Sequence, residues 1–474
     1  MREHTIRQVA ALAGATGGDS DDPAGPDVVV DSRLATPGSV FVALPGERVD
    51  GHDYLAAAAQ RGAVAALCLR ATDAPLAHLL VPDAVAALSA LARGVVAEAK
   101  ASGLECVGIT GSSGKTSTKD LLGQVLAAQA PTVSPKGSFN NEIGVPLTAL
   151  RIDAGTRYLV SEFGARGGGH ITWLSGIVPP DVGVVLNVGH AHLGEFGSVA
   201  GIAQAKGELV EAVPATGWAV LNADDPLVLG MAPRTTARLA TFAASGRPGP
   251  GELRVWAESV TADELQRHSF VLRSAGAVEA AEPVSLQGAG SHQVANALAA
   301  ATAALALGLP PAVVAGALTG AVAQSQWRMQ LMPRPDGVLV VNDSYNANPD
   351  SMRAALTTVA GMRRPGGRVV AVLGDMLELG PDAAAEHREL GRLAAGLGFV
   401  VVAIGDFAEA IAEGVRMASG SVRVVADRDA AVAVAGADLE ASDVVVVKAS
   451  RGLALEVVAD ALASGPDAGA GERR

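Results

Sequence analysis

The chain alternates short apolar runs with longer alanine-rich stretches along almost its whole length. In the first hundred residues, the runs at 27–33, 39–44 and 64–69 predict strands, and the stretches between them predict helices. From residue 105 onward, the runs at 157–164 and 181–189 again alternate with helical stretches. This order of elements is typical of a parallel sheet wound with helices.

The last third of the chain repeats the alternation of strand and helix. Its strands are predicted at residues 337–345, 368–376, 399–406, 422–427 and 443–452. These runs are almost entirely apolar, which indicates strands buried on both faces and therefore a second, Rossmann-like doubly wound sheet. The predicted fold class is α/β, with three domains at residues 1–100, 101–331 and 332–474.

Two stretches within this pattern need separate interpretation. Residues 295–324 carry no charge, but Pro310 and Pro311 interrupt them, so they predict two soluble helices rather than a membrane span. Residues 324–337 carry neither a strand nor a helix pattern and predict a linker between the second and third domains.

Composition narrows the possible partners and the compartment. A formal net charge of −13 argues against nucleic acid, whose binding depends on clustered Lys and Arg. Cys68 and Cys106 both lie inside apolar runs, which favours buried thiols in a reducing cytoplasm. The first residues make a poor signal peptide. We therefore expect a cytoplasmic monomer that neither enters a membrane nor binds nucleic acid.

The stretch TGSSGKTSTKD, residues 110–120, predicts a nucleotide-binding P-loop. It follows the apolar run 105–109, and the predicted helix 117–128 follows it. Glycines let the backbone N–H groups turn toward one anion, the helix N-terminus faces the same point, and a lysine and a threonine add a cation and a Mg²⁺ ligand. Ile109 departs from the strict motif, which has glycine there. The phosphate-binding candidates are Gly111, Ser112, Ser113, Gly114, Lys115, Thr116 and Ser117.

Two residues of the second domain are candidate metal ligands, and a lysine nearby has a plainer explanation. Glu162 ends one predicted strand and His192 follows another, so both are expected at the strand ends where ligands bind in such sheets. A carboxylate and an imidazole suit nucleotide-bound Mg²⁺, although a turn-capping glutamate and an ordinary loop histidine are the alternatives. Lys206 lies on a helix, and the residues alone favour a lysine that extends to water or pairs with Glu208 or Glu211.

Other polar residues cluster in four places along the chain. Asn140 and Asn141 lie in a Gly- and Asn-rich stretch that a plain turn would also explain. His292 and Asn296 are four residues apart, hence on one helix face with small neighbours that admit a flat ring. Arg328 lies in the predicted linker, where an exposed arginine is the default. The loop after strand 337–345 adds Asp343, Tyr345, Asn346 and Asn348, with an Asx turn as the alternative.

Several of these stretches occur in the order found in Mur ligases, the amide-forming enzymes of peptidoglycan synthesis. The chain resembles this family over essentially its whole length, through TGSSGKTSTKD, FNNEIGVP, AHLGEFGS with AKGE, NADD, HQVANALAA, DSYNANPDSM, GDMLELG and VKASRG. The opening DSRLATPGSVFVALPGERVDGHDY, with YNANPDSM and GDMLELG, resembles the family member that joins D-alanyl-D-alanine to UDP-N-acetylmuramoyl-tripeptide.

The resemblance implies a reaction in which ATP phosphorylates the peptide carboxylate. The incoming amine then attacks the acyl phosphate, and the products are the amide, ADP and phosphate. This route is chemically sound because a carboxylate is a poor electrophile, whereas an acyl phosphate has a good leaving group that Mg²⁺ can clamp. The first domain would bind the UDP end of the substrate, the second ATP, and the third would complete the site.

The resemblance also assigns roles to the candidate residues. The P-loop would hold the ATP phosphates with Lys115 as a catalytic cation, and Arg328 would contact the γ-phosphate. The residues that would surround adenosine are Asn296 and Asp343 with their neighbours His292, Tyr345 and Asn346. Thr116 and Glu162 would hold one Mg²⁺ and His192 a second, with Lys206 carbamylated by CO₂ as a further ligand. His190 competes with His192 for this role. The expected substrate contacts are Ser32, Arg33, Arg48, Asp50, Asn140, Asn141, Arg166, Lys448 and Arg451.

Two other classes of protein share part of this pattern. Other amide ligases of the superfamily, such as folylpolyglutamate synthase, share the P-loop and the carbamyl-lysine plan but differ in the loop that here reads YNANP. A P-loop switch or transport ATPase would end its second strand in a Walker B aspartate, whereas this strand ends in Glu162.

Overall fold

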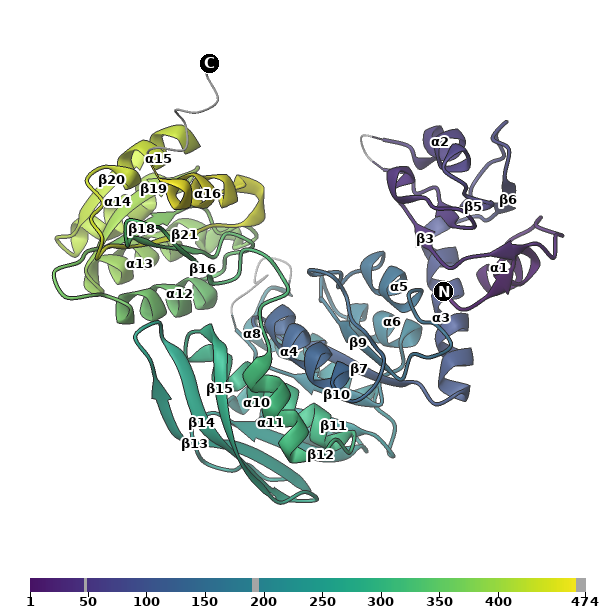
Figure 1. Ribbon diagram of the computed structural model, residues 1–474, viewed down its shortest axis with the longest axis horizontal. Coiled ribbons are helices and arrows are strands. Elements are labelled where there is room, and N and C mark those ends of the chain that lie inside the picture. Colours follow the sequence, from purple (N-terminus) through teal and green to yellow (C-terminus); the bar gives the residue numbers. More distant parts are fainter. Residues whose placement is uncertain (47–48, 190–195, 466–474) are drawn as a thin grey trace.

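The computed structural model describes residues 1–46, 49–189 and 196–465. Arg48, His190 and His192 lie outside the described residues. Three larger sheets follow one another along the chain, and Figure 1 shows them as three separate lobes, the first beside the second and the third above it. The predicted α/β class is confirmed. The boundaries near residues 100 and 332 stay predictions.

The first lobe is built on a four-stranded parallel sheet in the order β3-β4-β5-β6. Its strands and helices are β1 His4–Thr5, α1 Ile6–Ala13, β2 Pro23–Ala24, β3 Val28–Val29, β4 Val40–Val42, α2 Leu55–Gln60, β5 Ala65–Cys68, β6 Ala77–Leu80 and α3 Ala84–Ala101. The long helix α3 packs against α1 on one side and against α5 and α6 of the second lobe on the other. It therefore ties the first lobe to the second.

The second lobe contains a nine-stranded sheet in the order β15-β14-β13-β12-β11-β10-β7-β9-β8. Its strands are β7 Glu105–Thr110, β8 Thr132–Val133, β9 Tyr158–Glu162, β10 Val182–Val185, β11 Trp218–Asn222, β12 Arg238–Ala243, β13 Leu253–Ala262, β14 Arg267–Gly276 and β15 Ala280–Ala289. Strands β7 to β13 pair in parallel, which is the arrangement predicted from the runs that form β7, β9 and β10. The antiparallel pairs β13-β14 and β14-β15 extend the sheet in a way that the sequence analysis did not predict.

Seven helices are described around this sheet. They are α4 Lys115–Ala127, α5 Gly144–Ala149, α6 His170–Ile177, α8 Val199–Glu211, α9 Pro226–Leu229, α10 His292–Ala306 and α11 Pro311–Gly320. Helix α10 packs its alanine side chains closely against α4, because small residues let two helix backbones approach. The predicted helix pair interrupted at Pro310 is confirmed. Among the described residues, no helix is long and apolar enough to span a membrane.

The third lobe has a six-stranded sheet in the order β16-β17-β21-β18-β19-β20. Its elements are β16 Gln330–Pro333, β17 Leu339–Asn342, α12 Pro349–Gly361, β18 Val369–Leu373, α13 Ala383–Gly396, β19 Phe399–Ile404, α14 Ala408–Met417, β20 Ser421–Val425, α15 Arg428–Gly436, β21 Val444–Lys448 and α16 Glu456–Ser464. Separate apolar clusters fill its two faces, which confirms the doubly wound arrangement.

One prediction about this region was wrong. Residues 324–337 were predicted to be a linker throughout, yet residues 330–333 form β16, which pairs antiparallel with β17. An edge strand tolerates Pro333 because one of its sides needs no ladder hydrogen bond. The connection proper is therefore shorter and includes Ser325 to Met329.

Candidate active site

A cavity of about 650 Å³ lies where the second and third lobes meet. Residues of the predicted P-loop line it from the second lobe, and residues of the loop after β17 line it from the third. The predicted site residues that line it are Ser112, Ser113, Gly114, Lys115, Thr116, Ser117, Asn140, Asn141, Glu162, Arg166, Lys206, His292, Asn296, Arg328, Asp343, Tyr345, Asn346, Lys448 and Arg451. The fold thus gathers in one place residues that are more than three hundred positions apart.

The P-loop joins β7 to α4 and leaves the N-terminus of α4 open. The helix begins at Lys115 rather than at the predicted Ser117, and its N-cap Gly114, at φ 80°, has no side chain to bond the first N–H groups. A Cβ at Gly114 would also lie 2.5 Å from Asn296 Oδ1, so only glycine fits. Uncapped N–H groups at the positive end of a helix dipole form an anion site.

A second loop, after β10, braces the P-loop from the side. Asn187 Oδ1 accepts from Ser113 N at 2.9 Å, and Asn187 Nδ2 donates to Ser113 O at 3.2 Å. Gly189 N donates to Ser112 Oγ at 2.9 Å. Sequence reasoning missed Asn187, whose position directly after a strand of the parallel sheet was the available signal.

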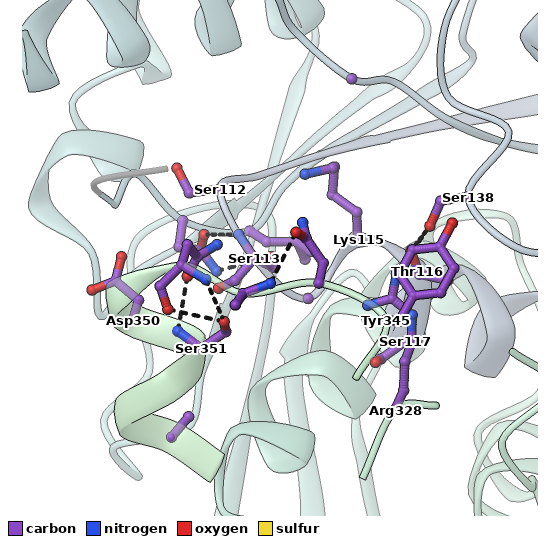
Figure 2. Close-up of a pocket in the computed structure, with 18 of the residues that line it drawn as sticks. Ser112, Ser113, Lys115, Thr116, Ser117, Ser138, Arg328, Tyr345, Asp350 and Ser351 are labelled. Atoms are coloured by element: carbon purple, nitrogen blue, oxygen red, sulfur yellow. Dashed lines mark hydrogen bonds between the residues drawn. The ribbon is translucent and has the colours of Figure 1, made fainter. Parts of the chain in front are cut away.

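A polar cluster forms around the Thr116 hydroxyl. Thr116 Oγ1 donates to Glu162 Oε2 at 2.9 Å. Arg328 Nη2 donates to the same hydroxyl at 3.0 Å and to Ser138 Oγ at 2.9 Å, and Figure 2 shows Thr116, Ser138 and Arg328 close together. Asn140 Nδ2 donates to the other oxygen, Glu162 Oε1, at 2.8 Å. Arg328 is therefore not an exposed arginine, and Ser138 joins the cluster although sequence reasoning did not name it.

Two lysines of the second lobe, Lys115 and Lys206, line the cavity, and both have lowered pKa values. Lys115 Nζ donates to Gly111 O at 2.6 Å; burial lowers its pKa and Arg328 lowers it further, while Glu162 opposes the shift. Burial lowers the pKa of Lys206 well below its usual range, and the charge of Lys115 adds to this. No hydrogen bond or ion pair joins Lys206 to another described residue. A neutral amine is the form that such a position favours.

The neighbours of Lys206 fix the backbone of helix α8 rather than the lysine itself. Glu208 accepts from Gly169 N, from Thr172 N at 2.9 Å and from Thr172 Oγ1 at 3.1 Å, all at the start of α6. Arg234 lies over Gly207, where a Cβ would overlap its guanidinium, and pairs with Glu211 at 2.9 Å. Both glutamates that were alternative partners of Lys206 are thus engaged elsewhere.

The third lobe presents a bonded loop to the cavity. Lys448 Nζ donates to Asp343 Oδ2 at 2.6 Å and to Asn346 O at 2.9 Å. Asn348 caps helix α12 through a bond from Ser351 N at 2.8 Å, which is a helix cap rather than the Asx turn given as the alternative. The Lys448 ammonium therefore holds the loop in shape.

The start of helix α10 faces this loop across the cavity. His292 Nδ1 is buried without a hydrogen-bond partner, and burial lowers the pKa of His292. Asn296 Nδ2 donates to Gln293 Oε1 at 3.0 Å. A second cavity of about 340 Å³ adjoins the first and shares Ser117, Gln293, Arg328 and Met329 with it.

The remaining candidate contacts fall into two groups. In the second lobe, Arg166 pairs with Glu142 at 3.0 Å, and Asn141 Oδ1 accepts from Ile143 N at 3.3 Å and from Gly144 N at 2.8 Å, just before α5. In the first lobe, Ser32, Arg33 and Asp50 do not line the cavity; Arg33 pairs with Asp31 at 2.7 Å, and Asp50 pairs with Arg70 at 3.0 Å.

Comparisons with known proteins agree with this geometry. Three family descriptions match the chain in order. Residues 27–105 match "Mur ligase family, catalytic domain". Residues 109–304 match "Mur ligase middle domain", and residues 327–451 match "Mur ligase, glutamate ligase domain". The chain belongs to the Mur ligase family. It is an ATP-dependent ligase.

Named relatives of this Mur ligase extend over nearly its whole length. A UDP-N-acetylmuramoyl-tripeptide–D-alanyl-D-alanine ligase of Mycobacterium tuberculosis is 46% identical and 98% of each chain is covered. The crystal structure of MurF from Acinetobacter baumannii superposes with a TM-score of 0.85 at 31% identity, covering 98% of this chain and 99% of that one. The crystal structure of MurF ligase from Thermotoga maritima in complex with ADP superposes with a TM-score of 0.77 at 30% identity. The superposition covers 92% of this chain and 97% of that one.

The cavity of this Mur ligase fits a nucleotide with a bound divalent cation. The uncapped helix start offers N–H groups to phosphate, and the glycine there admits close approach. Thr116 and Glu162 supply hard oxygen ligands of the kind Mg²⁺ takes. Among the described residues, no group of three or more His, Cys, Asp or Glu side chains is arranged to hold a metal by itself, so phosphate oxygens and water would complete the shell.

Proposed function

We propose that this Mur ligase joins D-alanyl-D-alanine to UDP-N-acetylmuramoyl-tripeptide at the expense of ATP, in the synthesis of the peptidoglycan precursor. The observation that carries the proposal is the single cavity that the P-loop and the DSYNANP loop line together. Similarity over the whole length to ligases with this printed activity supports it. The proposed domains are 1–100 for the UDP end of the substrate, 101–331 for ATP and 332–474 to complete the site.

The proposed reaction has two steps. A carboxylate oxygen of the tripeptide attacks the γ-phosphorus, the bond to the bridging oxygen breaks, and ADP leaves. The amine of D-alanyl-D-alanine then attacks the acyl carbon, loses a proton, and expels phosphate with the oxygen that came from the carboxylate. Lys115 and Arg328 are proposed to follow the negative charge of the transferring phosphoryl group.

Mg²⁺, when bound, would neutralise phosphate charge and clamp the acyl phosphate. Thr116 and Glu162 are proposed to hold one ion, and their mutual hydrogen bond supports this assignment. Lys206 is proposed to react as its neutral amine with CO₂, giving a carbamate that adds an anionic oxygen ligand for a second ion. Its burial and lowered pKa support this. His192, outside the described residues, remains the proposed partner for that ion.

Substrate contacts and location are also part of the proposal. Asn296 and the Asp343 loop are proposed for adenosine, Asn140 and Arg166 for the reacting end of the peptide, and Arg451 for the incoming dipeptide. The first lobe is proposed to bind the uridine end through Ser32, Arg33, Arg48 and Asp50. We propose a cytoplasmic monomer, and the two buried free thiols support that compartment.

The test is phosphate release from ATP with one component omitted at a time. We expect release only when the UDP-linked tripeptide and D-alanyl-D-alanine are both present. Replacing D-alanyl-D-alanine by glutamate serves as the control for the folylpolyglutamate synthase alternative. Rapid hydrolysis of ATP alone would refute the ligase proposal.

A further inference from the structure

The segment that carries Arg328, residues 325–329, begins with an anchor on the P-loop helix. Ser325 N donates to Asp120 Oδ2 at 2.9 Å, and Lys119 Nζ donates to Ser325 Oγ at 3.4 Å. Lys119 and Asp120 pair with each other and are 1% and 4% exposed. Removing one partner of a buried ion pair strongly destabilises the folded protein, because the other charge is left buried and unpaired. The start of the segment is therefore fixed to α4.

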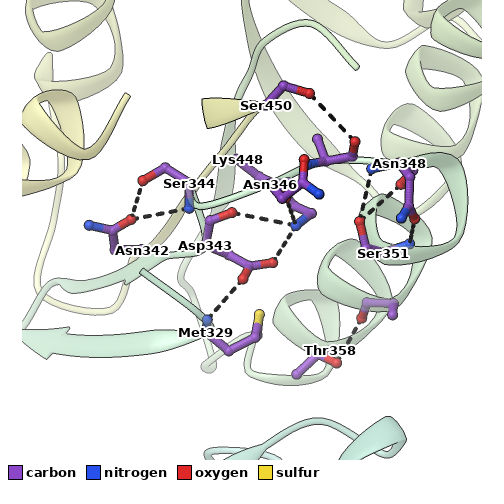
Figure 3. A network of polar contacts seen from close by, with 12 residues as sticks. Met329, Asn342, Asp343, Ser344, Asn346, Asn348, Ser351, Thr358, Lys448 and Ser450 are labelled. Carbon is purple, nitrogen blue, oxygen red and sulfur yellow. Dashed lines mark hydrogen bonds and ion pairs between the residues drawn. The ribbon is translucent and has the colours of Figure 1, made fainter. Parts of the chain in front are cut away.

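The end of the segment is bonded to the third lobe on both sides of Arg328. Tyr345 N donates to Trp327 O at 3.2 Å, and Met329 N donates to Asp343 Oδ1 at 3.0 Å. Figure 3 shows Met329 bonded to Asp343, which Lys448 holds in turn. The loop after β17 thus presents Arg328 to the second lobe.

The backbone on either side of Arg328 is in an unfavourable conformation. The φ angles of Trp327 and Met329 are 58° and 48°. These values lie in the left-handed region, which residues other than Gly, Asn and Asp rarely adopt. Such residues persist where surrounding contacts hold them, and they gather at functional sites. The segment therefore depends on its side-chain contacts to keep this shape.

The ring of Trp327 supplies those contacts. It stacks on Tyr345 with 6.5 Å between ring centroids and 26° between planes, and Arg451 Cζ lies 4.3 Å from its centre. Arg328 Cζ lies 4.4 Å from the centre of the Tyr345 ring, and Figure 2 shows the two side chains together. Cation–π and aromatic contacts therefore run from Arg451 through Trp327 and Tyr345 to Arg328.

We propose that Trp327 is a positioning residue for Arg328. Its ring, held between Tyr345 and Arg451 of the third lobe, keeps the segment in the left-handed turn from which the Arg328 guanidinium reaches Thr116 and Ser138. The position of the third lobe is thereby coupled to the position of Arg328 at the phosphate site of the second lobe. The inference rests on the role proposed above for Arg328.

The test is a double-mutant cycle of Trp327→Ala and Arg328→Ala, with kcat, KM and the affinity for ADP measured separately. We expect Trp327→Ala to lower kcat about tenfold, with KM for the UDP-linked substrate unchanged. Trp327→Phe, which keeps an aromatic ring, should retain most of the rate. In the Arg328→Ala background, Trp327→Ala should change kcat by less than about twofold, because the residue it positions is absent.

The controls separate this inference from the proposed function. Trp256→Ala removes an indole from β13, outside the cavity, and should leave kcat unchanged. Full additivity of the two losses, or a Trp327→Phe variant as slow as Trp327→Ala, would overturn the inference. A normal kcat for Arg328→Ala would instead refute the role of Arg328. If Trp327→Ala does not fold, Trp327→Leu takes its place in the cycle and the same comparison decides.

Discussion

Gly207, the residue after Lys206 in helix α8, contacts Arg234. We therefore predict that Gly207→Ala destabilises α8, although alanine favours helix more than glycine does. A Cβ at position 207 would overlap the Arg234 guanidinium, so the arginine must leave. It would lose its bonds to Ala203 O at 3.3 Å and Gln204 O at 2.9 Å, and its ion pair with Glu211 at 2.9 Å. The structural cost falls on the turn of α8 that carries Lys206.

The expected size of this effect follows from ordinary magnitudes. The two hydrogen bonds contribute about 1 kcal/mol each, and the half-exposed ion pair about 0.5 kcal/mol. Alanine returns about 1 kcal/mol of helix propensity. The net loss is therefore about 1.5 kcal/mol. Without Arg234 there is no overlap, so in an Arg234→Ala background the same substitution should stabilise α8 by about 1 kcal/mol.

Amide hydrogen exchange across Val199–Glu211 is the suitable assay, because a chain of three lobes need not unfold in two states. Gly207→Ala alone should speed exchange of α8 amides about tenfold. In the Arg234→Ala background it should slow exchange by about fivefold. Faster exchange in both backgrounds would show that the overlap with Arg234 is not the cause, and the reasoning would fail.

Three further predictions concern single residues. Lys115→Ala should lower turnover by orders of magnitude while circular dichroism stays native, and near-normal turnover would remove the P-loop lysine from the mechanism. Lys206→Ala should nearly abolish turnover, with partial rescue by short-chain carboxylates that fails for Lys115→Ala; an active Lys206→Ala variant would refute the carbamate. Burial raises the pKa of Cys106 to about 12, so the thiol carries almost no thiolate at pH 8 and a maleimide at that pH should label it only after unfolding. Rapid labelling of the native protein would contradict this.

Local patterns in the sequence account for much of the fold and for the P-loop. Continuous apolar runs such as 444–447 and 369–373 predict buried parallel strands, and both are fully buried in the third sheet. The antiparallel strands β13 to β15 were missed because their buried positions alternate with exposed ones, so no continuous buried run marks them. Strand β16 was missed because its four residues include a proline, which argues against a strand except at an edge.

The site was harder to predict wherever a contact joins distant residues. Lys119 and Asp120 are of types usually exposed, and contacts with Pro135 and with Ser325 of the connection accompany their burial. The contact of Trp327 with Arg451 joins the connection to the third lobe across more than a hundred residues, so no local pattern indicates it. The bond from Lys448 to Asp343 also joins residues far apart in the sequence, so no local pattern indicates it. The substrate contacts themselves stay predictions.

The central claim is that phosphate activates the peptide carboxylate, and an oxygen label tests it most directly. The UDP-linked tripeptide would be prepared with ¹⁸O in its reacting carboxylate, and the phosphate released in a complete reaction with D-alanyl-D-alanine would be analysed by mass spectrometry. An acyl phosphate transfers one carboxylate oxygen to phosphorus, so each phosphate should carry one ¹⁸O. Unlabelled phosphate accompanying full amide formation would contradict the account.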